Sequence, residues 1–179
     1  MSAVGAPNAW GWHPLTDEWA ARVVADAGVR PGDLVLDIGA GRGALTGHLV
    51  AAGAQVVAVE LHPDRAAHLR ERFAGRPVTV VRADAAALRL PRRPFRVVSS
   101  PPYAVTSAVL RTLLAPDSRL ISADLVLQRA AARRYADGRV PGSQRWLRRW
   151  TVDVGRSVPR RAFVPPPRVD SAVLTIRRR

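Results

Sequence analysis

The chain of 179 residues contains no cysteine, which excludes disulfide bonds and thiolate metal ligands. No apolar run approaches the roughly 18 residues of a membrane-spanning helix, so the sequence predicts no such helix. The first residues lack both a basic start and a long apolar stretch, and a secretory signal is therefore not expected. These absences predict a cytoplasmic protein without a metal site. The length suits one domain with a substantial core.

Lysine is also absent, so all 28 basic residues are arginine. Against 14 acidic residues they give a net charge of +14 and a pI of about 11.8. The excess is uneven, because residues 133–179 hold 13 arginines and three acids. This favours a polyanionic partner, although part of the charge is an ordinary solvated face. We expect contacts to nucleic acid from Arg133, Arg134, Arg145, Arg148, Arg149, Arg177, Arg178 and Arg179.

Apolar runs and glycine breaks alternate along the chain in a pattern typical of strands and helices. Near-continuous apolar strands between helices favour a mostly parallel sheet with helices on both faces. The prediction is an α/β fold with seven strands in one domain over residues 1–179. Residues 136–145 are predicted to form a loop, and the last two strands to pair antiparallel at the sheet edge. The predicted strands are 34–38, 55–59, 78–81, 95–99, 120–127, 150–154 and 171–176; the predicted helices are 16–27, 44–52, 63–73, 105–114 and 128–135.

A glycine-rich turn follows the first predicted strand. Asp37 lies at the end of that strand, and Gly39, Gly41 and Gly43 precede the next helix. Glycines there let the backbone turn tightly and approach a ligand closely. The same residues satisfy the dinucleotide-binding pattern, with Glu60 about 20 residues on, where an acid binds ribose hydroxyls. Taken alone, this turn leaves a nicotinamide enzyme open.

Two acids favour S-adenosylmethionine over a dinucleotide. Asp37 precedes the glycines, as methyltransferases prefer, and Asp84 follows the third predicted strand, where it can accept from an adenine amine. An acid at a strand end can also simply cap the backbone, so neither acid decides alone. Open α/β folds bind ligands at the carboxyl ends of their strands, and the two acids would meet there.

The tetrad Ser100-Pro101-Pro102-Tyr103 follows the fourth predicted strand. It fits the (Asp/Asn/Ser)-Pro-Pro-(Tyr/Phe) pattern of enzymes that methylate amino groups on nucleobases. Such an amine is a poor nucleophile, because its lone pair is delocalised into the ring. A side-chain oxygen and a backbone carbonyl held rigid by proline can accept its two hydrogens, and the aromatic ring can stack on a flipped-out base. A turn that merely ends a strand is the plainer alternative.

With these motifs the chain resembles the ribosomal RNA adenine N6-methyltransferases. Within them it resembles the Erm macrolide–lincosamide–streptogramin B resistance enzymes, in the short form found in mycobacteria and relatives. Residues 124–129 and the segment from Phe163 to Leu174 extend the likeness over nearly the whole chain. The resemblance implies a Rossmann-like class I S-adenosylmethionine-dependent methyltransferase fold. It implies catalytic roles for Ser100, Pro101, Tyr103 and Phe163, and cofactor binding by His13, Leu15, Asp37, Gly39, Gly41, Glu60, Asp84, Ala85 and Ser100.

Three departures from the family pattern are visible. The family's Gln-Asn/His-Phe-Leu segment appears as Trp12-His13-Pro14-Leu15, in which His13 and Leu15 retain the match. Ser100 stands where most relatives have asparagine. No separate helical domain follows the sheet, so we expect the catalytic domain itself to bind RNA, through residues 133–149 and the tail Arg177–Arg179.

The resemblance implies methyl transfer from S-adenosylmethionine to N6 of an adenine in 23S ribosomal RNA, with drug resistance as the phenotype. Tyr103 and Phe163 would flank the flipped adenine, and transfer would be direct, without a covalent enzyme intermediate. A monomer is expected. Two alternatives stay open. One is a methyltransferase for 16S ribosomal RNA or for a protein amine, and the other is a catalytically impaired RNA-binding relative.

Overall fold

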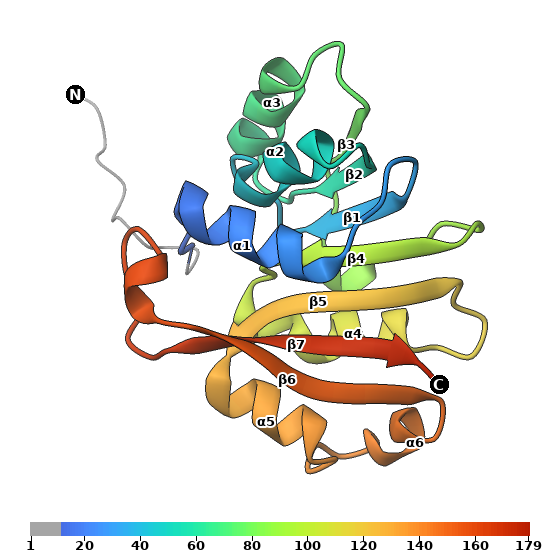
Figure 1. The fold of residues 1–179 in the computed structure, drawn as a ribbon. Coiled ribbons are helices and arrows are strands. Elements are labelled where there is room, and N and C mark those ends of the chain that lie inside the picture. Colours follow the sequence, from blue (N-terminus) through green and yellow to red (C-terminus); the bar gives the residue numbers. More distant parts are fainter. Residues whose placement is uncertain (1–11) are drawn as a thin grey trace.

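A computed structural model describes residues 12–179, which form one seven-stranded sheet with helices on both faces (Figure 1). Across the sheet the strand order is β3-β2-β1-β4-β5-β7-β6. Strands β1 to β5 run parallel, and β7 is antiparallel to both of its neighbours. The predicted α/β fold is confirmed. The strands are β1 (Leu34–Ile38), β2 (Gln55–Val59), β3 (Val78–Val81), β4 (Phe95–Ser99), β5 (Leu120–Gln128), β6 (Trp150–Val158) and β7 (Ser171–Arg178).

The central strands are apolar on both sides, and this explains why helices cover both faces. All five residues of β1 are buried. One face packs against α1 and α2 through a core that includes Val24 and Leu49, and the other packs against α4, α5 and α6 around Phe95 and Trp150. The helices are α1 (Asp17–Ala27), α2 (Ala44–Ala51), α3 (Pro63–Arg72), α4 (Thr106–Leu113), α5 (Arg129–Ala136) and α6 (Gln144–Leu147).

The strand order reverses beside β1, which pairs with β2 on one side and β4 on the other. In open α/β sheets, ligands bind outside the carboxyl ends of the strands at such a reversal. The glycine-rich turn leaves β1 at this edge, and the proline turn leaves β4 next to it. The topology therefore brings the two predicted motifs together.

The first four strands have the predicted bounds, whereas the two C-terminal strands are longer. β6 continues to Val158 and β7 to Arg178. A β-bulge between Val154 and Ser157 interrupts the alternation of buried and exposed residues, which is why the sequence pattern of β6 ends early. The two strands pair antiparallel as predicted, but β6 alone forms this edge because β7 lies between it and β5.

Several short elements have no counterpart in the sequence pattern. The predicted loop at residues 136–145 ends in α6, whose first residues are Gln144 and Arg145. Three 3₁₀ turns, η1 (Ala85–Ala87), η2 (Tyr103–Val105) and η3 (Arg160–Ala162), occupy connections at the carboxyl edge. In the part of the chain that the structure describes, no helix is long and apolar enough to cross a membrane.

Candidate functional site

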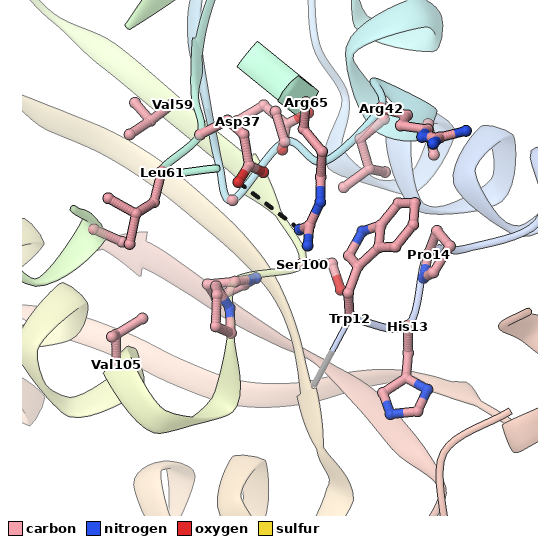
Figure 2. A pocket seen from close by; sticks show the side chains of 18 of the residues that line it. Trp12, His13, Pro14, Asp37, Arg42, Val59, Leu61, Arg65, Ser100 and Val105 are labelled. Carbon is pink, nitrogen blue, oxygen red and sulfur yellow. Dashed lines mark ion pairs between the residues drawn. The ribbon is translucent and has the colours of Figure 1, made fainter. Parts of the chain in front are cut away.

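A cavity of about 310 Å³ opens where the strand order reverses (Figure 2). The segment before α1 forms one wall, and the turns that follow β1, β2, β3 and β4 form the others. The proline-turn tetrad contributes all four of its residues to the lining. The structure thus brings together most of the residues predicted to bind the cofactor: His13, Leu15, Asp37, Gly39, Glu60, Asp84, Ala85 and Ser100.

Gly39 lies directly against the proline turn. Its φ of +75° is in the left-handed region that favours glycine. A Cβ atom at this position would lie 2.9 Å from Cδ of Pro102 and 3.5 Å from Cα of Pro101. The first approach is closer than non-bonded carbon atoms tolerate, so a side chain at Gly39 would displace the tetrad. The glycine turn and the tetrad are therefore packed as one unit.

Glu60 follows β2, and its buried carboxylate is fixed by two backbone N–H groups. Gly41 N–H donates to Oε2 at 2.8 Å, and His62 N–H donates to Oε1 at 2.9 Å. Gly41 was predicted to bind the cofactor, but in the described chain it does not line the cavity. Its N–H instead orients the Glu60 carboxylate. A carboxylate has about four acceptor positions, so Glu60 keeps unused ones in the cavity it lines, where Oε1 also lies 3.8 Å from Nη1 of Arg65.

Asp84 caps the backbone, and its position in the cavity is compatible with the cofactor role that the sequence left open. Its Oδ1 accepts the N–H of Ala86 at 2.9 Å and so caps η1. The residue also lines the cavity together with Ala85. One carboxylate oxygen can hold the turn while the other accepts from an amine, because the carboxylate has more acceptor positions than the cap uses.

Asp37 is buried at the end of β1, where its Oδ2 accepts a hydrogen bond from Thr46 Oγ1 at 2.7 Å. Burial raises the pKa of Asp37 to about 7; the bond from Thr46 lowers it, and the nearby charge of Glu60 raises it further. Burial outweighs the hydrogen bond because it penalises the charged form of the carboxyl group.

This raised pKa predicts how stability depends on pH. Between about pH 4 and 7 the folded protein keeps the Asp37 proton that the unfolded chain releases, so the free energy of unfolding falls as pH rises. The expected slope from this group is on the order of 1 kcal/mol per pH unit, and it vanishes above the folded pKa. In Asp37→Asn this contribution should disappear, as measured by urea unfolding across the window. Asp84→Asn, which alters an exposed carboxylate, is the control. Parallel curves for wild type and Asp37→Asn would contradict the prediction.

Tyr103 is held in the cavity wall by a contact to the antiparallel part of the sheet. It begins η2, and its hydroxyl lies 3.1 Å from Oγ of Ser171 at the start of β7. Burial raises the pKa of the Tyr103 phenol above its usual range, against the hydrogen bond with Ser171, which lowers it. The side chain therefore stays neutral and keeps a defined orientation.

Phe163 does not line this cavity within the described chain, although the sequence predicts that it flanks the adenine. Its side chain is only 2% exposed and packs in the core beneath α1. Its backbone forms an antiparallel bridge with Leu15, which does line the cavity. Phe163 thus lies behind the wall, and its contact with a base stays a prediction.

Trp12 is a cavity residue that the sequence reasoning missed. Its indole ring lies beside Arg65 (Figure 2), whose guanidinium carbon is 4.6 Å from the ring centroid; that of Arg42 is 5.8 Å away. A Cβ at Gly41 would lie 2.7 Å from Nε1 of Trp12. The replacement of the family's glutamine by tryptophan is the signal that could have pointed to cation–π contacts here.

Six of the eight arginines predicted to bind RNA lie at the sheet end remote from the cavity. Trp150, which begins β6, pairs with Arg178 near the end of β7, whereas Gln128 pairs with Ser171 at the cavity edge. Figure 1 shows α6 and the C-terminus together at this remote end. Arg133 and Arg134 lie closer to the cavity edge, because their helix, α5, begins directly after β5 ends at that edge. The remote residues are Arg145, Arg148, Arg149, Arg177, Arg178 and Arg179.

Residues 177 and 178 do not form a free tail, because strand pairing continues to Arg178; the contact of Arg177–Arg179 with RNA stays a prediction. Arg177 belongs to β7 and donates to Asp124 Oδ1 at 2.8 Å. Arg178 lies over the Trp150 ring, with 5.3 Å between the guanidinium carbon and the ring centroid, and Arg179 Nε donates to the Trp150 carbonyl at 3.4 Å. These side chains hold the strands together.

Three exposed arginines near the cavity were not predicted. Arg160 and Arg161 lie in η3 and Arg168 follows, all in the connection from β6 to β7 at the cavity edge. Next to them, the carbonyl of Pro165 accepts a hydrogen bond from His13 Nδ1 at 2.8 Å, which ties the connection to the cavity wall. Between residues 12 and 179 no carboxylate pairs with these three guanidinium groups.

Comparison with known proteins gives a family match. A family model described as "Ribosomal RNA adenine dimethylase" matches residues 11–179. The chain is 38% identical over 191 residues to a "Ribosomal RNA small subunit methyltransferase A" of Anaeromyxobacter dehalogenans, covering 94% of this chain and 66% of that one. It is 32% identical over 179 residues to an "rRNA adenine N-6-methyltransferase" of Bacillus licheniformis, covering 97% and 62%. The chain spans about two thirds of the length of these relatives.

Two solved structures share the fold. The crystal structure of the 23S rRNA methyltransferase ErmE superposes with a TM-score of 0.83 at 34% identity, over 92% of this chain and 69% of that one. A dimethyladenosine transferase of Plasmodium falciparum gives a TM-score of 0.81 at 23% identity, over 93% and 64%. The expected likeness is thus present at the level of the adenine methyltransferases, and relatives of both the large-subunit and the small-subunit kind match.

Proposed function

The chain belongs to the ribosomal RNA adenine dimethylase family, and from this membership we propose that it transfers a methyl group from S-adenosylmethionine to N6 of an adenine in 23S ribosomal RNA. The observation that carries the proposal is the packing of Gly39 against the Pro101-Pro102 turn. A cofactor held by the glycine turn would then have its reactive end beside the residues that receive the amine. Cytoplasmic location, a monomeric state and a single domain stay predictions.

The cavity residues fit S-adenosylmethionine, whose sulfonium supplies an electrophilic methyl group. Glu60 would hold the ribose hydroxyls and Asp84 the adenine amine, each with acceptor positions that their backbone contacts leave unused. Leu61, which is 44% exposed and lines the cavity, offers an apolar surface for the adenine ring. Family membership favours this cofactor over a nicotinamide nucleotide.

The tetrad would act on the target amine by accepting its hydrogens. Ser100 Oγ and the Pro101 carbonyl are the proposed acceptors, and Tyr103 is the proposed stacking surface. Holding the amine in line with the methyl group lowers the barrier through orientation. A general base is not required, because the proton can pass to water after transfer.

Small-subunit ribosomal RNA is the second candidate substrate, favoured by the 38% identity to a small-subunit methyltransferase. The large-subunit candidate is favoured by the likeness to the 23S rRNA methyltransferase ErmE, at 34% identity and a TM-score of 0.83. Radiolabelled methyl transfer to naked 23S and 16S RNA, followed by primer extension to the modified position, separates the two. Modification of 23S RNA with macrolide resistance in cells expressing the chain is the expected result. Labelling of 16S RNA alone would support the second candidate, and labelling of neither RNA would contradict both.

We expect Ser100→Asn to raise the rate of methyl transfer about 2- to 10-fold and to increase the ratio of dimethylated to monomethylated adenine. The amide oxygen accepts without a proton of its own to orient, and one better hydrogen bond contributes about 0.5–1.5 kcal/mol. Nucleoside chromatography of digested RNA at a fixed time measures the ratio. Ser100→Ala, which removes the acceptor, should slow transfer. If all three proteins transfer methyl groups at one rate, Ser100 does not contact the amine in the rate-limiting step.

A further inference from the structure

A second cavity of about 220 Å³ lies between α4 and α5, on the far side of Tyr103 from the proposed cofactor site. We call it the α4–α5 groove. Tyr103 lines both cavities, so it forms the wall between them. The groove also contains Gln128, the last residue of β5, and Arg134 of α5. It therefore begins at the catalytic edge of the sheet and leads away along α5.

The walls of the groove combine apolar, hydrogen-bonding and cationic groups. Ser107 Oγ and the Tyr135 hydroxyl lie 2.6 Å apart and form a polar pair between α4 and α5. Gln128 adds an amide, and Ala131 leaves space between the helices. Arg134 is exposed, and within residues 12–179 no carboxylate pairs with it. An unpaired guanidinium beside an amphipathic recess suits a nucleotide, since it can bind phosphate with two hydrogen bonds.

The size of the groove limits what can enter it. Cavities that enclose a whole drug-sized ligand measure roughly 300–1,000 Å³. At about 220 Å³ the groove accepts a base or a ribose, with the phosphate outside at Arg134. If the target adenosine stacks on Tyr103, the adjacent nucleotides of the RNA strand must pass beside the Tyr103 ring. The groove lies on one side of that ring.

We propose that the α4–α5 groove is a subsite for the nucleotide next to the target adenine, and that Arg134 binds the phosphate of that nucleotide. The inference rests on the proposed function, because it takes the target base to stack on Tyr103. It assigns substrate positioning to residues outside the cofactor cavity. Arg134 is in this sense a positioning residue, not a catalytic one.

Two pairs of variants of the full chain test the subsite. Arg134→Ser and Arg119→Ser each remove one exposed positive charge, but Arg119 does not line the groove in the described chain and lies just before β5, at the sheet end remote from the cavity. Ala131→Met narrows the groove without a change of charge, and Ala130→Met adds the same side chain at an exposed position outside it. The binding probe is a fluorescein-labelled single-stranded oligoadenylate of about ten nucleotides, a length that covers one typical site. The activity probe is naked ribosomal RNA.

Arg134→Ser should raise both Kd for the oligonucleotide and KM for ribosomal RNA about tenfold, as expected for the loss of one charge-assisted hydrogen bond. Ala131→Met should raise both at least about fivefold, and kcat at saturating RNA should change little. Arg119→Ser should cost less than about threefold, through long-range charge alone, and Ala130→Met nothing measurable. Circular dichroism must show all four variants folded with the wild-type melting temperature.

The outcomes separate this inference from the proposed function. If wild type methylates RNA but Arg134→Ser behaves as Arg119→Ser, or Ala131→Met as Ala130→Met, the subsite is overturned and the function stands. If wild type transfers no methyl group while the Arg134 and Ala131 variants lose oligonucleotide binding, the subsite stands as an RNA site and the proposed function falls. If the wild type neither methylates nor binds RNA, both fall.

Discussion

Tyr103→Ala should lower kcat/KM for methyl transfer to RNA by at least about 100-fold, with the affinity for S-adenosylmethionine changed less than about twofold. Base stacking on one aromatic ring contributes about 1–3 kcal/mol, the upper end of which corresponds to roughly 150-fold. Loss of orientation adds to this, since a flipped base without a stacking partner samples unproductive positions. Tritiated methyl transfer measures the rate, and isothermal titration calorimetry measures cofactor affinity.

Tyr103→Phe is the matched control for this variant. It keeps the stacking ring and removes only the hydroxyl that lies 3.1 Å from Ser171 Oγ. A hydrogen bond of this kind contributes about 0.5–1.5 kcal/mol, so the loss in kcat/KM should stay below about tenfold. Equal losses of cofactor affinity and methyl transfer in Tyr103→Ala would instead assign the ring to the cofactor or to folding. A lowered melting temperature in thermal unfolding would identify the second case.

The parallel half of the fold could be predicted from the sequence because each of its signals is local. Apolar runs such as Val97-Val98 bury both faces of a strand, and glycines such as Gly39 end a strand with a turn. The rule that parallel strands present their carboxyl ends at one edge then places Glu60 and Ser100 in one site. The close packing of Gly39 against Pro102 depends on the register of β1 and β4, which no local pattern encodes.

The antiparallel half was predicted less well, for two physical reasons. The bulge near Arg156 breaks the alternation in β6, and the exposed Arg156 side chain forms an ion pair with Asp26 of α1. The end of β7 reads as a charged tail, although Arg177 pairs with buried Asp124. The sequence gives the number of arginines, but it does not show at which end of the sheet each of them lies. Their positions relative to the cavity could therefore not be predicted.

The direction of β6 and β7 gives the arginine clusters different relations to the site. The connection that carries Arg160, Arg161 and Arg168 joins these strands at the cavity edge, where its residue Phe163 pairs with Leu15. An RNA whose adenine enters the cavity must pass this edge. The cluster near α6 lies at the other end of the same strands. If the RNA phosphates near the target base contact the protein, removing three charges from the cluster at the cavity edge must weaken RNA binding more than removing three charges from the cluster near α6.

We therefore expect the triple variant Arg160→Ser, Arg161→Ser, Arg168→Ser to weaken RNA binding at least about 100-fold near physiological salt. Three phosphate contacts at about 1 kcal/mol each account for this loss, and the slope of log K against log salt should fall by about two, at roughly 0.7 per contact for a single strand.

The charge-matched triple variant Arg145→Ser, Arg148→Ser, Arg149→Ser should weaken binding less than about threefold and leave the slope nearly unchanged. It removes three exposed guanidinium groups from the remote end without breaking the ion pair of Arg177 with Asp124. Fluorescence anisotropy with labelled RNA at several salt concentrations measures both quantities. Equal losses would mean that RNA binding follows net charge alone, and a larger loss in the second variant would place the RNA at the opposite end of the sheet from Tyr103.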